Sequence, residues 1–190
     1  MNTVPHYAKL RRELATAIAQ INPETHQPQE RPWRDMPPTD DRLGEPPAAI
    51  AALFTKLGVN VRYVNGEGAN YDQKLDRLTL PDPAAFESPE AFTSIALHEL
   101  IHWTRAPARL NRWATTNHTR YDAEELVAEL GALYLADALG LKGYSMELHA
   151  EYVLGYQIDI ARRTGGEGAK LMPHAEAEAR KAVDWILARN

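Results

Sequence analysis

The sequence predicts an α+β protein in which a small, mostly antiparallel sheet packs on a bundle of helices. Residues 59–80 show short apolar runs bounded by glycine and proline, as strands do, whereas residues 121–189 repeat apolar side chains at helical spacing. An apolar helix that carries histidines is expected between these two regions. A small sheet followed by a helical bundle is an α+β arrangement.

The N-terminal part of the chain is expected to form one helix and an extended linker. Residues 7–21 place leucine and isoleucine at helical spacing. Residues 22–47 hold seven of the 13 prolines and few aliphatic side chains, so this stretch can bury little apolar surface. The sequence therefore predicts an N-terminal helix and proline-rich linker over 1–47 and a compact domain over 48–190.

The compact domain is expected to begin with a helix that starts behind Pro47 and ends at Gly58. Proline suits the first turn of a helix, and glycine suits the position after its last turn. Two strands are expected next, the first over 59–64 and the second over 75–80, with a glycine-containing turn between them. Pro81 ends the second strand because proline has no N–H to donate to a neighbouring strand.

Helices make up the rest of the predicted domain. The tripeptide Ser88-Pro89-Glu90 supplies a capping hydroxyl, a proline at the first helical position and an acid in the first turn, and it begins a helix that includes HELIHWT. Three further helices are expected, at 121–139, 145–164 and 170–189.

Composition excludes several classes of protein. The chain has no cysteine, which excludes disulfide frameworks, thiolate nucleophiles and cysteine-based zinc sites. Its 21 basic and 26 acidic side chains give a net charge of −5, so the chain as a whole is not a general nucleic-acid binder. No apolar run approaches about 18 residues, and the N-terminus lacks the apolar segment of a secretory signal. We therefore expect a cytoplasmic protein without a membrane segment.

One motif carries chemistry, because His98, Glu99 and His102 form the pattern HExxH. Residues four apart lie on one face of a helix, so both imidazoles can bind one ion. Neutral imidazoles suit zinc, and three protein ligands leave a fourth position for water. Glu99 can take a proton from that water as a general base. The sequence predicts one Zn²⁺ per chain, with another divalent metal as the alternative.

The third ligand is expected in the acidic stretch EELVAE at 124–129. No histidine follows the motif at the spacing of a third histidine ligand, and His118 lies in a polar stretch where exposure is expected. Glu125 and Glu129 lie one turn apart on a helix whose other face is rich in leucine. We assign Glu125 as the ligand and Glu129 as the partner of a ligand histidine. Glu124 or Glu129 as the ligand in place of Glu125 are the open alternatives.

Several stretches together resemble one known family. In chain order they are GANYDQKLDRLTLPDPAAFESPEAFTSIALHELIHWT, RLNR, EELVAELGALYLADALG and HAEYVLGY. They resemble the zincin-like metallopeptidase domain of ArdC-type antirestriction proteins, which recurs in polyvalent proteins of plasmids and phages, and the resemblance covers residues 48–187. It implies a zincin-like fold, a zinc-binding HExxH and a glutamate ligand on the following helix.

The family also implies a setting, which is conjugation or phage infection. ArdC-type proteins typically carry an N-terminal domain that binds single-stranded DNA. Residues 1–47 are too short and too rich in proline for such a domain, so this DNA-binding role is not carried over to the chain.

Arg105, Arg109 and Arg112 lie near Trp113 in a stretch without acids, and these residues are candidates for contact with single-stranded DNA. Pairing with nearby carboxylates such as Glu124 is the alternative.

Three further side chains are candidates for substrate contact or for support of the metal site. Tyr71, in the predicted sheet section before the motif helix, could help to align an extended peptide, or it could fill the edge of the core. His149 and Tyr152 match the His-Ala-x-Tyr pattern of the family. Either could support a ligand or stabilise a tetrahedral intermediate, and packing is the alternative for both.

These observations predict a zinc metallopeptidase of a mobile genetic element that cleaves a peptide or protein substrate. Its role would be antirestriction, or defence when the element enters a host cell. The alternative is a non-catalytic antirestriction module that shields DNA or a protein and in which the metal is structural.

Overall fold

The structure is a computed structural model, and it describes residues 6–26, 43–112, 118–143, 145–165 and 171–190, apart from the side chains of 118–120. In chain order its elements are α1 (Tyr7–Ala19), α2 (Ala48–Leu57), β1 (Val61–Val64), β2 (Asn70–Asp72), β3 (Arg77–Pro81), the 3₁₀ helix η2 (Pro83–Ala85), α3 (Pro89–Trp103), α4 (His118–Leu139), α5 (Met146–Thr164) and α6 (Leu171–Leu187).

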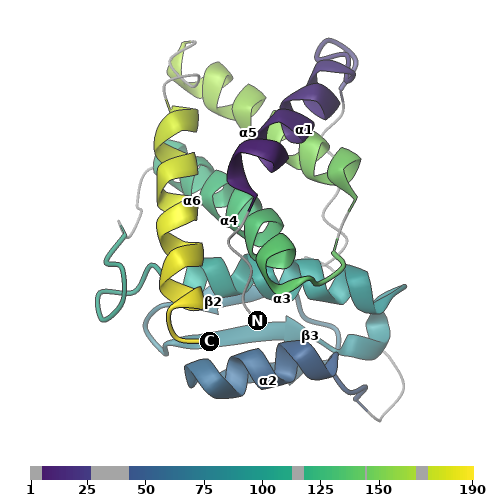
Figure 1. The fold of residues 1–190 in the computed structure, drawn as a ribbon, viewed down its shortest axis with the longest axis vertical. Coiled ribbons are helices and arrows are strands. Elements are labelled where there is room, and N and C mark those ends of the chain that lie inside the picture. The colour runs from purple at the N-terminus through teal and green to yellow at the C-terminus, as the bar shows by residue number, and fades with distance from the viewer. Residues whose placement is uncertain (1–5, 27–42, 113–117, 144, 166–170) are drawn as a thin grey trace.

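The sheet lies between two helices, with α2 on one face and α3 on the other (Figure 1). Helices α4, α5, α6 and α1 gather on the far side of α3. The predicted α+β class is confirmed. Among the described residues, no helix is both long and apolar enough to cross a membrane.

The sheet has the order β1-β3-β2 and mixed directions. β1 runs parallel to β3, and β2 runs antiparallel to it, so the prediction of a mostly antiparallel sheet describes only one of the two strand pairs. β2 was not predicted, because three residues are too few to show an alternating pattern.

The predicted second strand began too early at Leu75. This residue lies in the turn between β2 and β3 and is 55% exposed. The Asp72 carboxylate accepts hydrogen bonds from the backbone N–H groups of Lys74 and Leu75, and Asp76 has a positive φ of 45°. Aspartate side chains favour such turns, and this local preference outweighs the apolar side chain of Leu75.

α3 is the central helix of the fold, and every residue from Ala91 to Trp103 is buried. Its predicted start is confirmed: the backbone N–H of Ala91 donates to Ser88 Oγ at 3.1 Å, and Pro89 occupies the first helical position. Because the sheet and the helical bundle cover opposite sides of α3, polar side chains on this helix must find partners inside the protein.

Helix α4 comes very close to α3. A Cβ atom at Gly131 would lie 2.8 Å from the Ile101 side chain, which is nearer than carbon atoms can pack. Glycine at 131 therefore permits the close contact between the two helices that carry the candidate site.

Helix α1 packs on the same core as the rest of the described chain. Leu10 and Leu14 are buried in one apolar cluster with residues of α3 to α6. The other helices thus cover the apolar face of α1, which the sequence analysis placed outside the compact domain, and the predicted boundary at residue 48 stays a prediction. Residues 27–42 of the predicted proline-rich linker lie outside the described residues.

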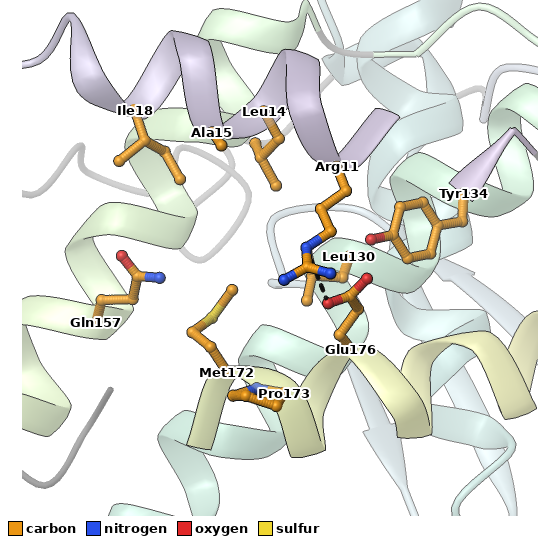
Figure 2. Close-up of a pocket in the computed structure, with 10 residues that line it drawn as sticks. All are labelled: Arg11, Leu14, Ala15, Ile18, Leu130, Tyr134, Gln157, Met172, Pro173 and Glu176. Atoms are coloured by element: carbon orange, nitrogen blue, oxygen red, sulfur yellow. Dashed lines mark ion pairs between the residues drawn. The ribbon is translucent and has the colours of Figure 1, made fainter. Parts of the chain in front are cut away.

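A cavity of about 280 Å³ remains where α1 meets α4, α5 and α6. Figure 2 shows the Tyr134 hydroxyl and the Arg11–Glu176 ion pair at one side of this cavity and Gln157 across from them. The Tyr134 hydroxyl is buried, and no described residue forms a hydrogen bond with it. The residues that line the cavity are Arg11, Leu14, Ala15, Ile18, Leu130, Tyr134, Gln157, Met172, Pro173 and Glu176.

Candidate metal centre

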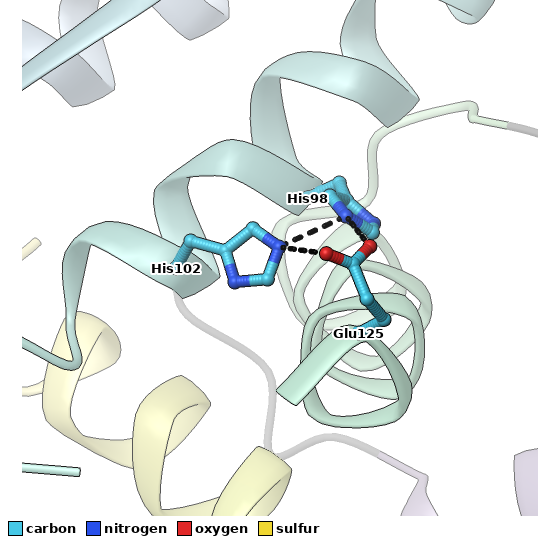
Figure 3. A group of neighbouring side chains, drawn as sticks. All are labelled: His98, His102 and Glu125. Carbon is cyan, nitrogen blue, oxygen red and sulfur yellow. Dashed lines mark hydrogen bonds and ion pairs between the residues drawn. The ribbon is translucent and has the colours of Figure 1, made fainter. Parts of the chain in front are cut away.

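Two imidazoles from α3 and one carboxylate from α4 converge at the contact between these helices (Figure 3). The Nε2 atoms of His98 and His102 lie 3.2 Å apart. Glu125 Oε2 lies 3.4 Å from His98 Nε2, and Glu125 Oε1 lies 3.6 Å from His102 Nε2. All three side chains are buried. The structure thus brings together the three residues that the sequence analysis selected as ligands.

These separations fit a single small cation. Bonds of about 2.0–2.1 Å in a tetrahedral site place neighbouring ligand atoms roughly 3.3–3.4 Å apart. The three observed separations, from 3.2 to 3.6 Å, lie on both sides of that value. Two imidazole nitrogens and one carboxylate oxygen suit a divalent transition metal such as zinc.

Each histidine has a second carboxylate on the opposite side of its ring. His98 Nδ1 lies 3.2 Å from Glu129 Oε2, and His102 Nδ1 lies 3.3 Å from Glu124 Oε1. A carboxylate there accepts a hydrogen bond from Nδ1–H, which leaves a lone pair on Nε2. Two lone pairs that face each other at 3.2 Å repel unless a proton or a metal ion lies between them.

The three glutamates of α4 thus contact different atoms of the two rings. Glu125 faces both Nε2 atoms, whereas Glu124 and Glu129 each face one Nδ1 atom. Glu129 contacts His98, and its role as the partner of a ligand histidine stays a prediction. The equivalent contact of Glu124 was missed, although this residue was considered as an alternative ligand. The side chain of His118, the other residue considered, lies outside the described part of the chain.

Glu99 is buried next to this cluster, at 5% exposure. Burial raises the pKa of its carboxyl, and the charges of His102 and His98 oppose that effect. Among the described residues, no side chain or backbone group donates a hydrogen bond to Glu99. A carboxylate in this setting can accept a proton from a reacting group.

Burial and the neighbouring carboxylates shift the pKa of His98 in opposite directions. Burial lowers the pKa of His98, but the hydrogen bonds and charges of Glu125 and Glu129 outweigh burial and raise this pKa to about 10. For Glu129, burial raises the pKa, whereas His149 and His98 outweigh burial and lower it to about 2. The cluster therefore favours a positive charge at the His98 ring and a negative charge at Glu129.

Helix α5 supplies two more contacts. His149 Nδ1 lies 2.5 Å from Glu129 Oε1, so one carboxylate bridges His149 and His98. The Tyr156 hydroxyl donates to Glu125 Oε2 at 2.9 Å. Tyr156 was not selected from the sequence, although it follows His149 by seven residues and therefore shares its helix face. Tyr152, which was selected, is buried on the same helix, and its catalytic role stays a prediction.

Arg112 is not free to bind DNA. It is 6% exposed, and its Nη2 and Nε donate to the two Glu124 oxygens at 2.9 and 3.2 Å. Arg112 thus pairs with Glu124, which was the alternative considered for it, and this pairing disfavours the predicted DNA contact. The Arg105 guanidinium lies 5.4 Å from the centre of the Tyr71 ring. Trp113 lies outside the described residues, and DNA binding by the chain stays a prediction.

Tyr71 lies on β2, an edge strand, and is 8% exposed. Its hydroxyl donates to Asp76 Oδ1 at 2.8 Å and accepts from Arg109 Nη2 at 2.9 Å. Arg109 also donates to Asp76 Oδ2 at 3.0 Å and to the Trp103 carbonyl at 2.6 Å. Arg109 thus ties the turn before β3 to the end of α3. The use of Tyr71 in aligning a peptide stays a prediction.

The family profile of zincin-like metallopeptidases matches residues 48–160, which is more than half of the chain. The chain belongs to this family. The matched residues begin with α2 and include the sheet, α3, α4 and most of α5, so every side chain of the candidate metal centre lies inside the match.

Similar proteins come from bacteria and their plasmids. A DNA primase TraC of Escherichia coli is 35% identical over 138 residues, which are 72% of this chain and 12% of TraC. A second TraC from the same species is 33% identical and is covered to 9%. Protein y4eC of Sinorhizobium fredii is 26% identical over 70% of this chain and 42% of its own length. The chain therefore spans only a small part of each TraC.

Two crystal structures of the antirestriction protein ArdC from plasmid R388 have a similar fold. The Mn(II)-bound structure has a TM-score of 0.62 and 28% sequence identity, and the match covers 80% of this chain and 55% of ArdC. The metal-free structure has a TM-score of 0.58 and 26% identity, with 53% of ArdC covered. The zincin-like α+β fold predicted from the sequence is thus confirmed.

Proposed function

We propose that this chain is a metal-dependent peptidase in which His98, His102 and Glu125 bind one divalent ion and Glu99 is the general base. The observation that carries the proposal is the group of three buried donor atoms, all within 4.8 Å of one another, with the buried Glu99 carboxyl on the same helix as the histidines. Zinc is our first choice of metal. Manganese is the alternative, because the similar ArdC structure contains Mn(II).

The metal would supply Lewis acidity, which polarises a substrate carbonyl and makes a nearby water more acidic. Glu99 would accept the proton of the attacking water and return it to the departing amine. Its raised pKa suits both transfers, because a carboxyl of higher pKa holds the proton better between the two steps.

The other residues of the cluster would keep the ligands in place. Glu124 and Glu129 hold the histidine rings through Nδ1, and Tyr156 holds one oxygen of Glu125. The site is largely shielded from bulk solvent, because α3 is buried from Ala91 to Trp103. Attraction between charges is stronger in such a site than in water.

We also propose that the substrate is a peptide or protein and that the chain acts in antirestriction for a mobile element. This context is supported by the ArdC protein of plasmid R388, which is named an antirestriction protein. The same name favours a second candidate, a module that shields DNA or a protein and uses its metal only for structure. The two functions differ in whether they need Glu99.

The test is a comparison of Glu99→Gln with wild-type protein and with Glu90→Gln, which makes the same change near the start of the same helix. Each protein is loaded with Zn²⁺ or Mn²⁺, its metal content is measured, and it is incubated with a library of bacterial peptides whose new termini are counted by mass spectrometry. We expect Glu99→Gln to retain metal and to lose at least about a hundredfold in cleavage rate, and Glu90→Gln to behave as wild type. Wild-type protein that binds metal yet cleaves no peptide would leave the shielding function as the better one.

A further inference from the structure

The side chain of Arg112 is buried at the contact between the two helices that carry the candidate metal ligands. It is 6% exposed and lies nine residues after Trp103, the last residue of α3. Arginine is almost never buried without partners for its charge and its N–H groups. The partners of Arg112 therefore indicate what this residue is for.

On one side, Arg112 binds a carboxylate of α4 with two parallel hydrogen bonds. Nη2 lies 2.9 Å from Glu124 Oε1, and Nε lies 3.2 Å from Glu124 Oε2. The carboxylate is 1% exposed, so Arg112 and His102 replace the water that it loses on folding. The planar fork of a guanidinium fixes both the position and the rotation of a carboxylate.

On the other side, Arg112 binds the end of α3. Nη2 donates to the Ile101 carbonyl and Nη1 donates to the Thr104 hydroxyl, both at 2.6 Å. The last carbonyl groups of a helix have no partners within the helix, and arginine is well suited to them because its positive charge matches the helix dipole. One side chain thus joins the C-terminal end of α3 to the first turns of α4.

The contact with Glu124 continues to the candidate metal centre. Glu124 Oε1 accepts from Arg112 and lies 3.3 Å from His102 Nδ1, so one oxygen connects the arginine to the histidine. On the opposite edge of the His102 ring, Nε2 points toward His98 and Glu125. If Glu124 rotated, the His102 ring would lose the hydrogen bond that fixes its orientation and its tautomer.

We propose that Arg112 is a positioning residue of the metal site, which fixes Glu124 and through it holds His102 Nε2 toward the ion. This inference rests on the proposed ligand set His98, His102 and Glu125. Arg112 would not touch the metal or the substrate. Its effect would appear in metal affinity and in the geometry of the bound ion.

The other histidine is held in a chemically different way. Glu129, which contacts His98, is held from its far side by His149 of α5. The two supporting carboxylates thus have separate partners, Arg112 from the segment after α3 and His149 from α5. Loss of Arg112 should therefore disturb the His102 side of the site and leave the contacts of His98 in place.

Arg109 offers a matched control on the same segment. Its side chain is also largely buried, at 8% exposure, but it binds Asp76, Tyr71 and the Trp103 carbonyl. Arg109→Gln removes the same charge and a comparable number of hydrogen bonds without touching Glu124. A general loss of stability should appear in both variants, whereas a loss of ligand positioning should appear only in Arg112→Gln.

The experiment measures the Zn²⁺ dissociation constant by competition with a chromophoric chelator, the visible absorption of bound Co²⁺, and the thermal midpoint of each variant without added metal. We expect Arg112→Gln to weaken Zn²⁺ binding about 10–100-fold and to change the Co²⁺ spectrum. We expect Arg109→Gln to change neither. Arg112→Lys should give an intermediate loss, since it keeps the charge but lacks the fork.

A double-mutant cycle tests whether the effect passes through Glu124. We expect Glu124→Gln to weaken Zn²⁺ binding by a similar factor, and Arg112→Gln in that background to add less than about threefold. Independent, multiplying losses would overturn the proposal, and so would unchanged Zn²⁺ affinity in a folded Arg112→Gln protein. Should Arg112→Gln fail to fold, unchanged affinity and Co²⁺ spectrum in Arg112→Lys would refute it. None of these readouts depends on peptide cleavage, so the result is separate from the test of Glu99.

Discussion

Replacing Glu125 by glutamine should remove most of the stabilisation that a bound metal gives to the protein. Glutamine keeps the size of the side chain, and its amide oxygen can still accept the hydrogen bond from Tyr156, which lies 2.9 Å from Glu125 Oε2. The variant should therefore fold. What it loses is the negative oxygen atoms that face both Nε2 atoms, at 3.4 Å from His98 and 3.6 Å from His102.

The expected size of the effect follows from mass action. Free metal at a hundred times its dissociation constant stabilises a folded protein by about 2.7 kcal/mol. In a domain of this length, each kcal/mol raises the thermal midpoint by roughly 2–4 °C, so wild-type protein should gain about 5–11 °C. A hundredfold weaker site at the same metal concentration is only half occupied and gains about 0.4 kcal/mol, or roughly 1–2 °C.

The assay is a thermal melt of each protein with and without Zn²⁺, repeated with Mn²⁺. Glu124→Gln and Glu129→Gln serve as comparisons, and Glu90→Gln is the control for the loss of one negative charge. We expect the metal-induced shift to be smallest in Glu125→Gln and partly reduced in Glu124→Gln and Glu129→Gln. A full shift in Glu125→Gln, together with none in one of the other two, would refute the assignment and make that residue the ligand.

Three further predictions concern the packing and the charges of the site. Gly131→Ala should lower the free energy of unfolding by about 1–3 kcal/mol in a denaturant titration, because the alanine Cβ would lie 2.8 Å from the Ile101 side chain. An unchanged value would mean that α4 can move away freely. Tyr134→Phe should leave the free energy of unfolding unchanged or raise it by up to about 1 kcal/mol, because the buried hydroxyl has no hydrogen-bond partner within the described part of the chain. A clear loss would indicate an ordered water in the cavity. Zn²⁺ affinity should rise about tenfold per pH unit from pH 6 to 8, because a proton competes with the metal for His98, whose pKa is raised to about 10. A Zn²⁺ affinity that does not change with pH would contradict that competition.

Local signals explain what the sequence predicted well. The start of α3 at Ser88 and the end of α2 at Gly58, which has φ 68°, depend on one or two residues each, so they can be read directly. The HExxH spacing and the spacing of Glu125 and Glu129 are also local, because each pair shares one helix face. These signals place the candidate ligands on two helices, but they do not determine how the helices meet.

Contacts between distant residues explain what the sequence did not predict. Tyr156 lies 31 residues after Glu125, and Arg112 meets Glu124 across a segment that joins two helices. Nothing in the local pattern distinguishes Tyr156 from Tyr152 four residues earlier, since both lie on apolar parts of α5. Arg112 resembled the other arginines of its segment for the same reason, because burial of an arginine depends on which carboxylate the fold brings to it.

The roles of the three glutamates on α4 follow from how that helix meets α3. His98, the earlier histidine, meets Glu129, the later glutamate, and His102 meets Glu124. Glu124 and Glu129 are five residues apart, about 7.5 Å along α4, and the histidines are four residues apart, about 6 Å along α3. The two outer carboxylates can therefore each reach one Nδ1 atom.

Glu125 then lies between them and faces both Nε2 atoms. In a slip of one residue along α4, Glu124 or Leu126 would take the place of Glu125, and Ala128 or Leu130 would take the place of Glu129. Gly131 opposes such a slip, because its missing side chain makes room for Ile101. Which glutamate faces both Nε2 atoms is therefore a property of the helix contact, to which Gly131 and Arg112 both contribute.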